Sequence, residues 1–290
     1  MLRKVVVGTD FSKPSEAVLD YLPRLRYAGL EHVLLTHVAH LVNVAGFEQV
    51  AMQAARESLE EQARRLRSHG LQVETELLTG AVAVELADVA EDLGAGAIVV
   101  GSHGRSLLGR ILLGSVSMSL LHQARVPTLI VRMELCETDE GISCELQPER
   151  PFDHLLFPTD LSEASGAAFE RIRPLAAATG ARVTLYHVDN PPAYDEGAAA
   201  DMDALHAEAR GELERMADEL RESGIDDVRT IVTTGAPAVS AVRYAESEGV
   251  TIIAMATQGR GAMEELMVGS VALKVARTSP VPVLMIPRRR

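Results

Sequence analysis

The sequence predicts an α/β protein made of two tandem copies of one domain, each with a parallel sheet covered by helices on both faces. Three observations support this fold class. The chain has 290 residues, which suits two domains of ordinary size. Its segments recur in a second copy about 150 residues later. Within each copy, short apolar runs alternate with helical patterns, and this order is typical of parallel sheets with crossover helices.

The internal repeat is visible as matched segments. VVGTDFS at 6–12 returns as LFPTDLS at 156–162, and GSV at 114–116 returns at 269–271. The offset between the copies rises from 150 to 155, so about five residues are inserted between 188 and 235. A period of this length indicates tandem domains rather than a solenoid.

An acidic segment without periodicity separates the two copies and contains two prolines near its end. We therefore expect a first domain at 1–133, a linker at 134–151 and a second domain at 152–290. The only two cysteines, Cys136 and Cys144, fall in this linker. They are expected to be either inert cytosolic thiols or a regulatory disulfide.

The first copy can be followed element by element. Lys4–Thr9 is a β-branched apolar run, as expected for a strand buried on both faces of a parallel sheet. Ser12 can cap the next helix, which fades near Gly29, and later helices end at Gly70 and Gly94. The remaining elements are expected as strands at His32–Val38, Leu71–Leu78, Ala97–Val100 and Thr128–Val131, and as helices at Phe47–His69, Val82–Leu93 and Ser115–Gln123. The second copy repeats this order.

Composition excludes several classes of protein. The formal net charge of −13 disfavours binding to nucleic acid or anionic lipid, and the basic run at 288–290 is short enough to be a solvated tail. Two cysteines exclude a disulfide scaffold and a four-cysteine zinc site. No apolar run approaches a membrane span, and the N-terminal MLRKVVVGTD is unlike a secretory signal. The expected location is the cytoplasm.

One segment carries most of the functional information. GSHGRSLLGRILLGSV at 101–116 lies between an expected strand and an expected helix, with glycines at Gly101, Gly104 and Gly114. Glycine lets the backbone approach a ligand closely. A helix start offers free N–H groups and partial positive charge, which suit phosphate, and Ser115 adds a hydroxyl there. The segment therefore predicts a phosphate-binding loop.

This loop is not one of the two commonest phosphate motifs. It lacks the Gly-Lys-Ser/Thr of the Walker loop and the tight G-x-G-x-x-G of dinucleotide folds. A glycine-rich connection without a ligand is the structural alternative.

The pattern resembles a known family. The GxxG at 101–104, followed after nine residues by Gly-Ser at 114–115, is similar to the nucleotide motif of the universal stress protein family. VGTDFS at 7–12, His37-Val38 and VPTL at 126–129 are also similar to that family. The likeness covers nearly all of both copies and leaves only the linker outside. It implies a tandem member of the ATP-binding branch.

The resemblance implies a specific fold. Each domain would be Rossmann-like, of the adenine nucleotide alpha hydrolase-like kind, with an open five-stranded parallel sheet in the order 3-2-1-4-5. Strands 1 and 4 are then neighbours at the topological switch point, where open α/β sheets bind ligands. The two domains would pair internally through their last strands, and a homodimer is a further option.

The resemblance also assigns the binding residues. Asp10 would face the ribose hydroxyls, Val38 the adenine, and the glycine loop the phosphates, with Arg105 and Arg110 in reach of phosphate oxygens. The set for the first copy is Gly8, Thr9, Asp10, Val38, Gly101, His103, Gly104, Arg105, Gly114, Ser115 and Val116. From the residues alone, Asp10 could equally be a turn or capping aspartate, and His103 an exposed loop histidine. His37 and His187 are expected to be buried, satisfied histidines rather than catalytic ones.

The second copy departs from the motif. Ala256 replaces the first glycine, which is costly if that position needs a positive φ and mild if it only ends a strand. Glu264 and Glu265 replace Gly109-Arg110 and bring negative charge toward phosphates. A weaker site is expected at Pro158, Thr159, Asp160, Val188, Gly259, Arg260, Gly269, Ser270 and Val271.

These features predict a stress-response regulatory protein that binds ATP or a related adenine nucleotide. No catalytic residue and no protein metal ligand is expected, and Mg²⁺ or Mn²⁺ would be held by the phosphates. The alternatives are a slow ATPase, a phosphoryl or nucleotidyl transferase, or a nucleotide-free scaffold.

Overall fold

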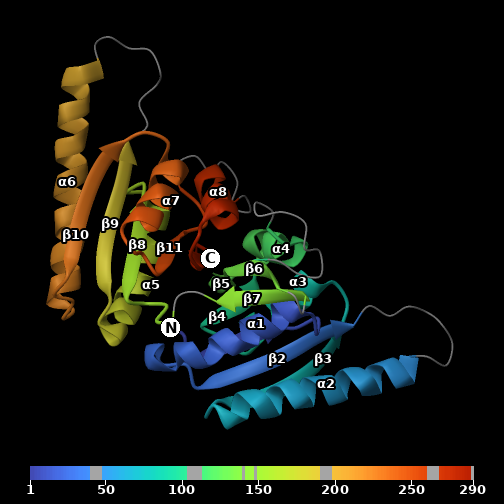
Figure 1. Cartoon of the computed structure of the whole chain (residues 1–290). Helices are drawn as coiled ribbons and strands as arrows, with labels where there is room; N and C mark the ends of the chain where they lie inside the picture. The colour runs from blue at the N-terminus through green and yellow to red at the C-terminus, as the bar shows by residue number, and fades with distance from the viewer. Residues whose placement is uncertain are drawn as a thin grey trace. The chain divides into compact units, whose positions relative to one another are not determined.

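The computed structural model describes residues 1–39, 48–102, 113–138, 141–146, 149–189, 198–259 and 268–288. The chain divides into two compact units, Met1–Glu149 and Arg150–Arg290, which we treat separately (Figure 1). Each unit is an α/β layer structure in which strands alternate with helices along the chain. This is the architecture that the alternating sequence pattern predicts.

The first unit contains a five-stranded parallel sheet in the order β3-β2-β1-β4-β5. The 3-2-1-4-5 order is confirmed, and it makes β1 and β4 neighbours, with Val5 paired to Ala97 and Val7 to Val99. Buried valines fill the centre of β1, as expected for a strand covered on both faces. The strands are β1 (Lys4–Gly8), β2 (His32–Ala39), β3 (Gln72–Thr79), β4 (Ala97–Gly101) and β5 (Thr128–Val131).

The helices of this unit are α1 (Lys13–Tyr21), α2 (Glu48–Ser68), α3 (Val82–Asp92) and α4 (Ser115–Gln123). Opposite faces of the sheet are covered by α1 and α3. Gly8 faces Leu86 of α3, whereas the next residue, Thr9, contacts Ser15 of α1 through its hydroxyl at 3.2 Å. Helices therefore cover both faces, as predicted.

The sequence predicts a single helix from Ser12 to about Gly29, and the structure divides it. The α-helix α1 stops at Tyr21 and continues as a 3₁₀ helix, η1 (Leu22–Ala28). Pro23 lies in the first turn of η1, and a proline there lacks the N–H that would continue the α-helical ladder. Gly29 then ends the element with a left-handed φ of 90°.

The second unit repeats the first. Its parallel sheet has the order β10-β9-β8-β11-β12, again 3-2-1-4-5 within the copy. Its strands are β8 (His154–Thr159), β9 (Arg182–Asp189), β10 (Val228–Thr234), β11 (Ile252–Ala256) and β12 (Val283–Ile286). Its helices are α5 (Glu163–Thr179), α6 (Ala198–Glu222), α7 (Pro237–Ser247) and α8 (Ser270–Thr278). The long helix α6 runs beside β10 and β9 (Figure 1).

The segment expected to be an irregular linker contains regular structure. It forms an antiparallel pair, β6 (Met133–Thr138) with β7 (Gly141–Leu146). In the pair, Cys136 is opposite Ser143 and Cys144 is opposite Leu135, so the two cysteines are not cross-strand partners. The acidic, non-periodic sequence of this segment did not predict these strands, whose pairing is seen only in the structure.

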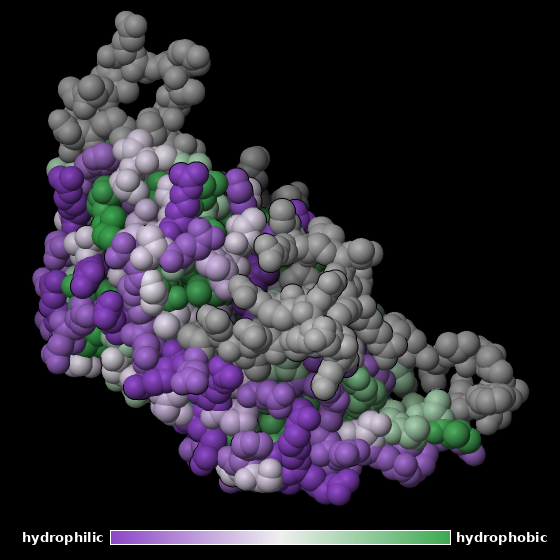
Figure 2. Space-filling model, viewed as in Figure 1, coloured by the Kyte–Doolittle hydropathy of each residue, from purple (hydrophilic) through white to green (hydrophobic). Residues whose placement is uncertain are grey.

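The described surface carries few large apolar side chains. Only Val50, Val84 and Leu205 stand out among the described residues as exposed large hydrophobics. The visible face is largely hydrophilic with scattered hydrophobic residues (Figure 2). Within the described ranges, no helix combines the length and apolar character that a membrane crossing requires.

Candidate functional site

The loop after each first strand is built around an aspartate. In the first unit, Asp10 Oδ1 accepts hydrogen bonds from the Ser12 amide at 3.0 Å and the Ser12 hydroxyl at 2.5 Å. In the second unit, Asp160 Oδ1 accepts from the Ser162 amide at 3.1 Å and from the Ser165 hydroxyl at 2.7 Å. One carboxylate oxygen thus holds the turn before α1 or α5, which is the turn role that the sequence left open.

A strained residue follows each aspartate, and the sequence gives no sign of it. Phe11 has a φ of 59° and Leu161 a φ of 60°, a left-handed conformation that is uncommon for side chains of this size. Their amides donate to the hydroxyls of Thr9 at 3.1 Å and Thr159 at 3.0 Å. The same strain at the same repeat position indicates that both loops must turn sharply at the strand end.

The backbone at the ends of β4 and β11 shows whether Ala256 is costly at the position that Gly101 has in the first unit. Gly101 is a strand residue paired with Val131, and Ala256 is a strand residue paired with Ile286. Extended backbone suits any residue, so Ala256 needs no left-handed conformation. The substitution is therefore the mild case of the two that the sequence left open.

Glycine caps both helices that follow the loops. Gly114 precedes α4 with a φ of −56°, and Gly269 precedes α8 with a φ of −63°. Each amide donates at 2.8 Å, Gly114 to the Ser102 carbonyl and Gly269 to the Thr257 carbonyl. A glycine cap has no side chain with which to bond the first helical amides, so those N–H groups can serve an anion.

The two sides of the switch point meet in the second unit. The side chain of Asp160, after β8, lies against Gly259, after β11, in the space that a Cβ atom on Gly259 would fill. A side chain at residue 259 would therefore displace the Asp160 carboxylate from this position. In the first unit, the buried Ser117 hydroxyl of α4 donates to the Gly101 carbonyl at 2.7 Å and fixes the helix mouth to β4.

Part of the predicted site lies outside the described residues. The loop positions His103, Gly104, Arg105 and Arg110 fall in 103–112, and Arg260, Glu264 and Glu265 fall in 260–267. The described members at the strand ends and helix mouths are Gly8, Thr9, Asp10, Val38, Gly101, Gly114, Ser115 and Val116 in the first unit, and Pro158, Thr159, Asp160, Val188, Gly259, Gly269, Ser270 and Val271 in the second.

The two repeat histidines are satisfied within the fold. His37 Nδ1 donates to the Thr9 carbonyl at 2.7 Å, and His187 Nδ1 donates to the Thr159 carbonyl at 2.8 Å. Each bond ties the second strand of a unit to the end of the first strand, at Thr159 of β8 or at Thr9 directly after β1. The ring of Phe11 also packs on His37, with centroids 4.4 Å apart.

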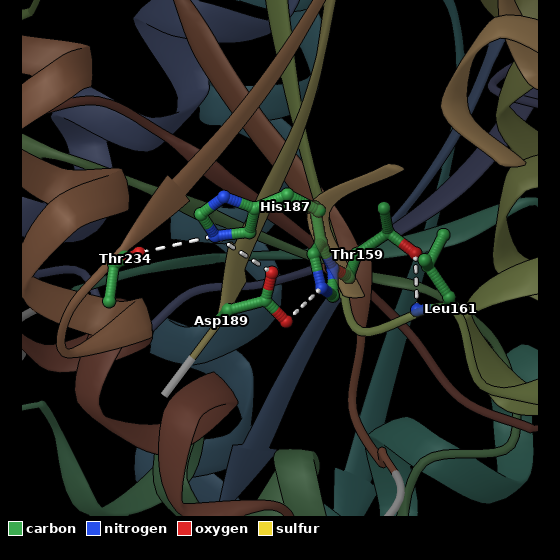
Figure 3. Close-up of polar contacts among 6 residues, drawn as sticks. Thr159, Leu161, His187, Asp189 and Thr234 are labelled. Carbon is green, nitrogen blue, oxygen red and sulfur yellow. Dashed lines mark hydrogen bonds and ion pairs between the residues drawn. The ribbon is translucent and has the colours of Figure 1, made fainter. Parts of the chain in front are cut away.

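A polar cluster in the second unit was not anticipated from the sequence. Asp189, at the end of β9, has His187 (Figure 3) and His206 within 3.3 Å of its carboxylate. The cluster borders a cleft lined by Leu161, Leu205, Glu208, Ala209 and Glu212 together with His187 and Asp189. His206 is on α6, so no local sequence spacing links it to Asp189.

Comparison with known proteins agrees with the geometry. A family model described as the universal stress protein family matches residues 1–132 and 151–287. A universal stress protein from Mycolicibacterium smegmatis is 28% identical over a 303-residue alignment that covers 97% of this chain and 96% of that protein. One from Mycobacterium tuberculosis is 32% identical over 251 residues, covering 83% of this chain and 80% of the relative.

A solved structure shows the same likeness over the whole length. The crystal structure of a universal stress protein from Archaeoglobus fulgidus matches with a TM-score of 0.73 and 26% identity, covering 98% of this chain and 96% of that one. Together with two matched domains in tandem, these likenesses settle the family. The chain therefore belongs to the universal stress protein family.

Proposed function

We propose that this protein binds an adenine nucleotide, ATP or a relative of it, in a regulatory role, and binds it mainly in the first unit. The observation that carries the proposal is the placement of a carboxylate loop and a glycine-capped helix at the ends of the adjacent strands β1 and β4. Open α/β sheets bind ligands at this switch point. The carboxylate side suits ribose hydroxyls, and the helix mouth suits phosphates.

The contact between Asp160 and Gly259 supports this arrangement. In the second unit, it places the carboxylate that follows β8 against the backbone that follows β11. A single ligand could therefore contact both. The first unit has the same elements in the same order. We assign the tighter site to the first unit because its loop sequence carries Arg105 and Arg110, whereas the second carries Glu264 and Glu265.

The proposal also covers a metal ion, two alternative functions, the location of the protein and the pairing of its domains. Mg²⁺ or Mn²⁺ would enter with the phosphates and screen their charge. Slow hydrolysis, or phosphoryl or nucleotidyl transfer, is the enzymatic alternative, and a nucleotide-free stress scaffold is the other. We also propose cytoplasmic location and pairing of the two domains through their last strands, with a homodimer as a further option.

Three measurements test the proposal. Mass and absorbance analysis of the purified protein should find a bound adenine nucleotide, and its absence together with no calorimetric binding of ATP would favour the scaffold. Turnover under saturating ATP should be negligible. Sustained product formation that is lost in Gly114→Val would establish the enzymatic alternative.

A further inference from the structure

The cluster around Asp189 joins three elements of the second unit. His187 Nε2 lies 3.2 Å from Asp189 Oδ1, and His206 Nε2 lies 3.3 Å from Asp189 Oδ2. His206 Nε2 is also 3.2 Å from the Thr234 hydroxyl of β10. We call this group of His187, Asp189, His206 and Thr234 the Asp189 clamp. It connects α6 to both β9 and β10, and three of its side chains, His187, Asp189 and His206, are mostly buried, whereas Thr234 is exposed.

A proton count shows that the contact between His187 and Asp189 needs one added proton. His187 Nδ1 faces a carbonyl oxygen and must carry a hydrogen to bond it. In a neutral ring, Nε2 would then present a lone pair to the Asp189 carboxylate, and two acceptors would face each other at 3.2 Å. The contact becomes a hydrogen bond only when one further proton lies on His187 or Asp189.

The second contact also depends on charge. Asp189 Oδ2 is buried and lacks an aligned hydrogen bond, although His206 Nε2 is within ion-pair distance. Attraction at this contact is therefore electrostatic and is strongest when His206 is an imidazolium. The side chains of Asp189, His187 and His206 are only 17%, 6% and 19% exposed, so solvent screens the pair weakly.

The groups that face the clamp favour a cation there. From α6, Glu208 and Glu212 line the adjoining cleft, and from β8 the Thr159 carbonyl points at His187. Thr234 of β10 supplies a neutral hydroxyl. The two imidazoles approach different oxygens of Asp189 instead of converging on one point, which suits a separate proton for each contact better than a shared metal ion.

The first unit shows that the fold does not require this clamp. Ala39 pairs with Thr79 just as Asp189 pairs with Thr234, so Ala39 is the counterpart of Asp189. The buried residues Leu59, Ala63 and Leu66 of α2 match Leu213, Ala217 and Leu220 of α6, and the same offset places Met52 at the position of His206. Asp189 and His206 are thus additions specific to the second unit, whereas His187 has a counterpart in His37.

We propose that the Asp189 clamp is a proton-dependent lock that holds α6 against the sheet of the second unit in weak acid and releases it in weak base. Histidine is the side chain that ordinarily changes charge in this range. The clamp lies next to Val188, the assigned adenine contact of the weaker site. The inference does not depend on nucleotide binding, and it makes the second unit the half that responds to pH.

Hydrogen exchange measured on the ligand-free full chain tests the lock. After correction for the intrinsic pH dependence of exchange, amides at 205–213 should exchange at least about threefold more slowly at pH 6 than at pH 8.5. Asp189→Ala, which installs the residue of the first unit, should remove that difference, as should Asp189→Asn, which keeps the shape. Asp218→Ala, a surface carboxylate on α6 that pairs with Arg221, should keep it. Helix α2 in the same sample is the internal reference.

A spectroscopic measurement provides an independent check. Ring ¹⁵N shifts should show both nitrogens of His187 protonated at pH 6. An unprotonated Nε2 of His187 at pH 6, or a pH difference in α6 that survives both Asp189 variants, would overturn the proposal. Stoichiometric Zn²⁺ binding at neutral pH that is lost in Asp189→Ala would also overturn it, by assigning the positive charge to a metal.

Discussion

In the second unit, the carboxylate of Asp160 lies against Gly259, in the space that a side chain at residue 259 would fill. The two residues follow β8 and β11, which are hydrogen-bonded neighbours, so their meeting is a direct consequence of the strand order. A glycine after the fourth strand is thus explained by the aspartate after the first.

This contact predicts the effect of adding one methyl group. Gly259→Ala should push the Asp160 side chain from its place and weaken nucleotide binding to the second unit by about tenfold, or about 1.4 kcal/mol. Gly166→Ala is the control, because a Cβ there meets no atom within 4 Å. Gly166 is inside α5, so its replacement should stabilise the fold by about 0.5–1 kcal/mol. Calorimetric binding to the second unit unchanged in a folded Gly259→Ala would refute the role of this contact.

The two functions assigned to Asp10 can be separated by two substitutions. Asp10→Asn keeps an oxygen for the Ser12 amide and hydroxyl, so the turn should survive while the charge is lost. Asp10→Ala removes both. We expect each variant to lose about 1.5–3 kcal/mol of binding free energy for adenosine and ATP alike, since the proposed partner is the ribose. Only Asp10→Ala should lower the free energy of unfolding. Loss of ATP binding with adenosine binding intact would instead place Asp10 near phosphate or metal.

Much of the fold was predictable because it is encoded locally. Ser12 caps α1, Gly29 and Gly94 end their elements with left-handed φ values, and the ranges of α4 and β5 are those the sequence predicts. The strand order came from the resemblance rather than from periodicity.

Other features depend on contacts between distant residues. The strained φ of Phe11 has no glycine to mark it, and the pairing of β6 with β7 appears only when the two strands meet. The approach of His206 to Asp189 joins a helix to a strand end, so sequence spacing could not reveal it. In the candidate site, the sequence located the strand ends and helix mouths, whereas the extended backbone at Ala256 was visible only in the structure.

A buried histidine at the far end of the second sheet predicts how stability depends on pH. His154 is 3% exposed, with Nδ1 donating to the Glu248 carbonyl at 3.2 Å and Nε2 at 2.9 Å from the Thr184 hydroxyl. Burial, with a smaller contribution from Arg182, lowers the pKa of His154 below its ordinary value of 6.5. The unfolded chain therefore binds the proton first as the pH falls.

His154 should make the folded protein less stable in acid. Stability contributed by neutral His154 is complete above about pH 6.5 and is lost as the pH falls through the lower pKa of the folded state. His154→Gln keeps a donor and an acceptor without a titrating group. Denaturant unfolding at pH 8 and pH 5 should show a smaller loss of stability in His154→Gln than in the unmodified chain. Equal losses in both proteins would contradict the assignment.

The loop charges of the second unit should matter more than its missing glycine. Because Ala256 has extended backbone, Ala256→Gly alone should change ATP affinity by less than about 0.5 kcal/mol. Glu264→Gly combined with Glu265→Arg removes two negative charges and adds a positive one, and it should strengthen the weaker site about tenfold, or about 1.4 kcal/mol. Titration calorimetry at low and high salt measures both effects. A large gain in ATP affinity from Ala256→Gly would show that the side chain of Ala256, and not the loop charge, limits binding.

Calorimetric titration of ATP into the unmodified protein and two matched variants tests the central claim most directly. Gly114 and Gly269 cap α4 and α8 with φ values that any residue accepts, so Gly114→Val and Gly269→Val should fold while filling the phosphate approach. The unmodified chain should show one tight site and a second that is at least about tenfold weaker. Gly114→Val should remove the tight site, and Gly269→Val should leave it. Two equivalent sites, or a tight site that survives Gly114→Val and disappears in Gly269→Val, would contradict the account.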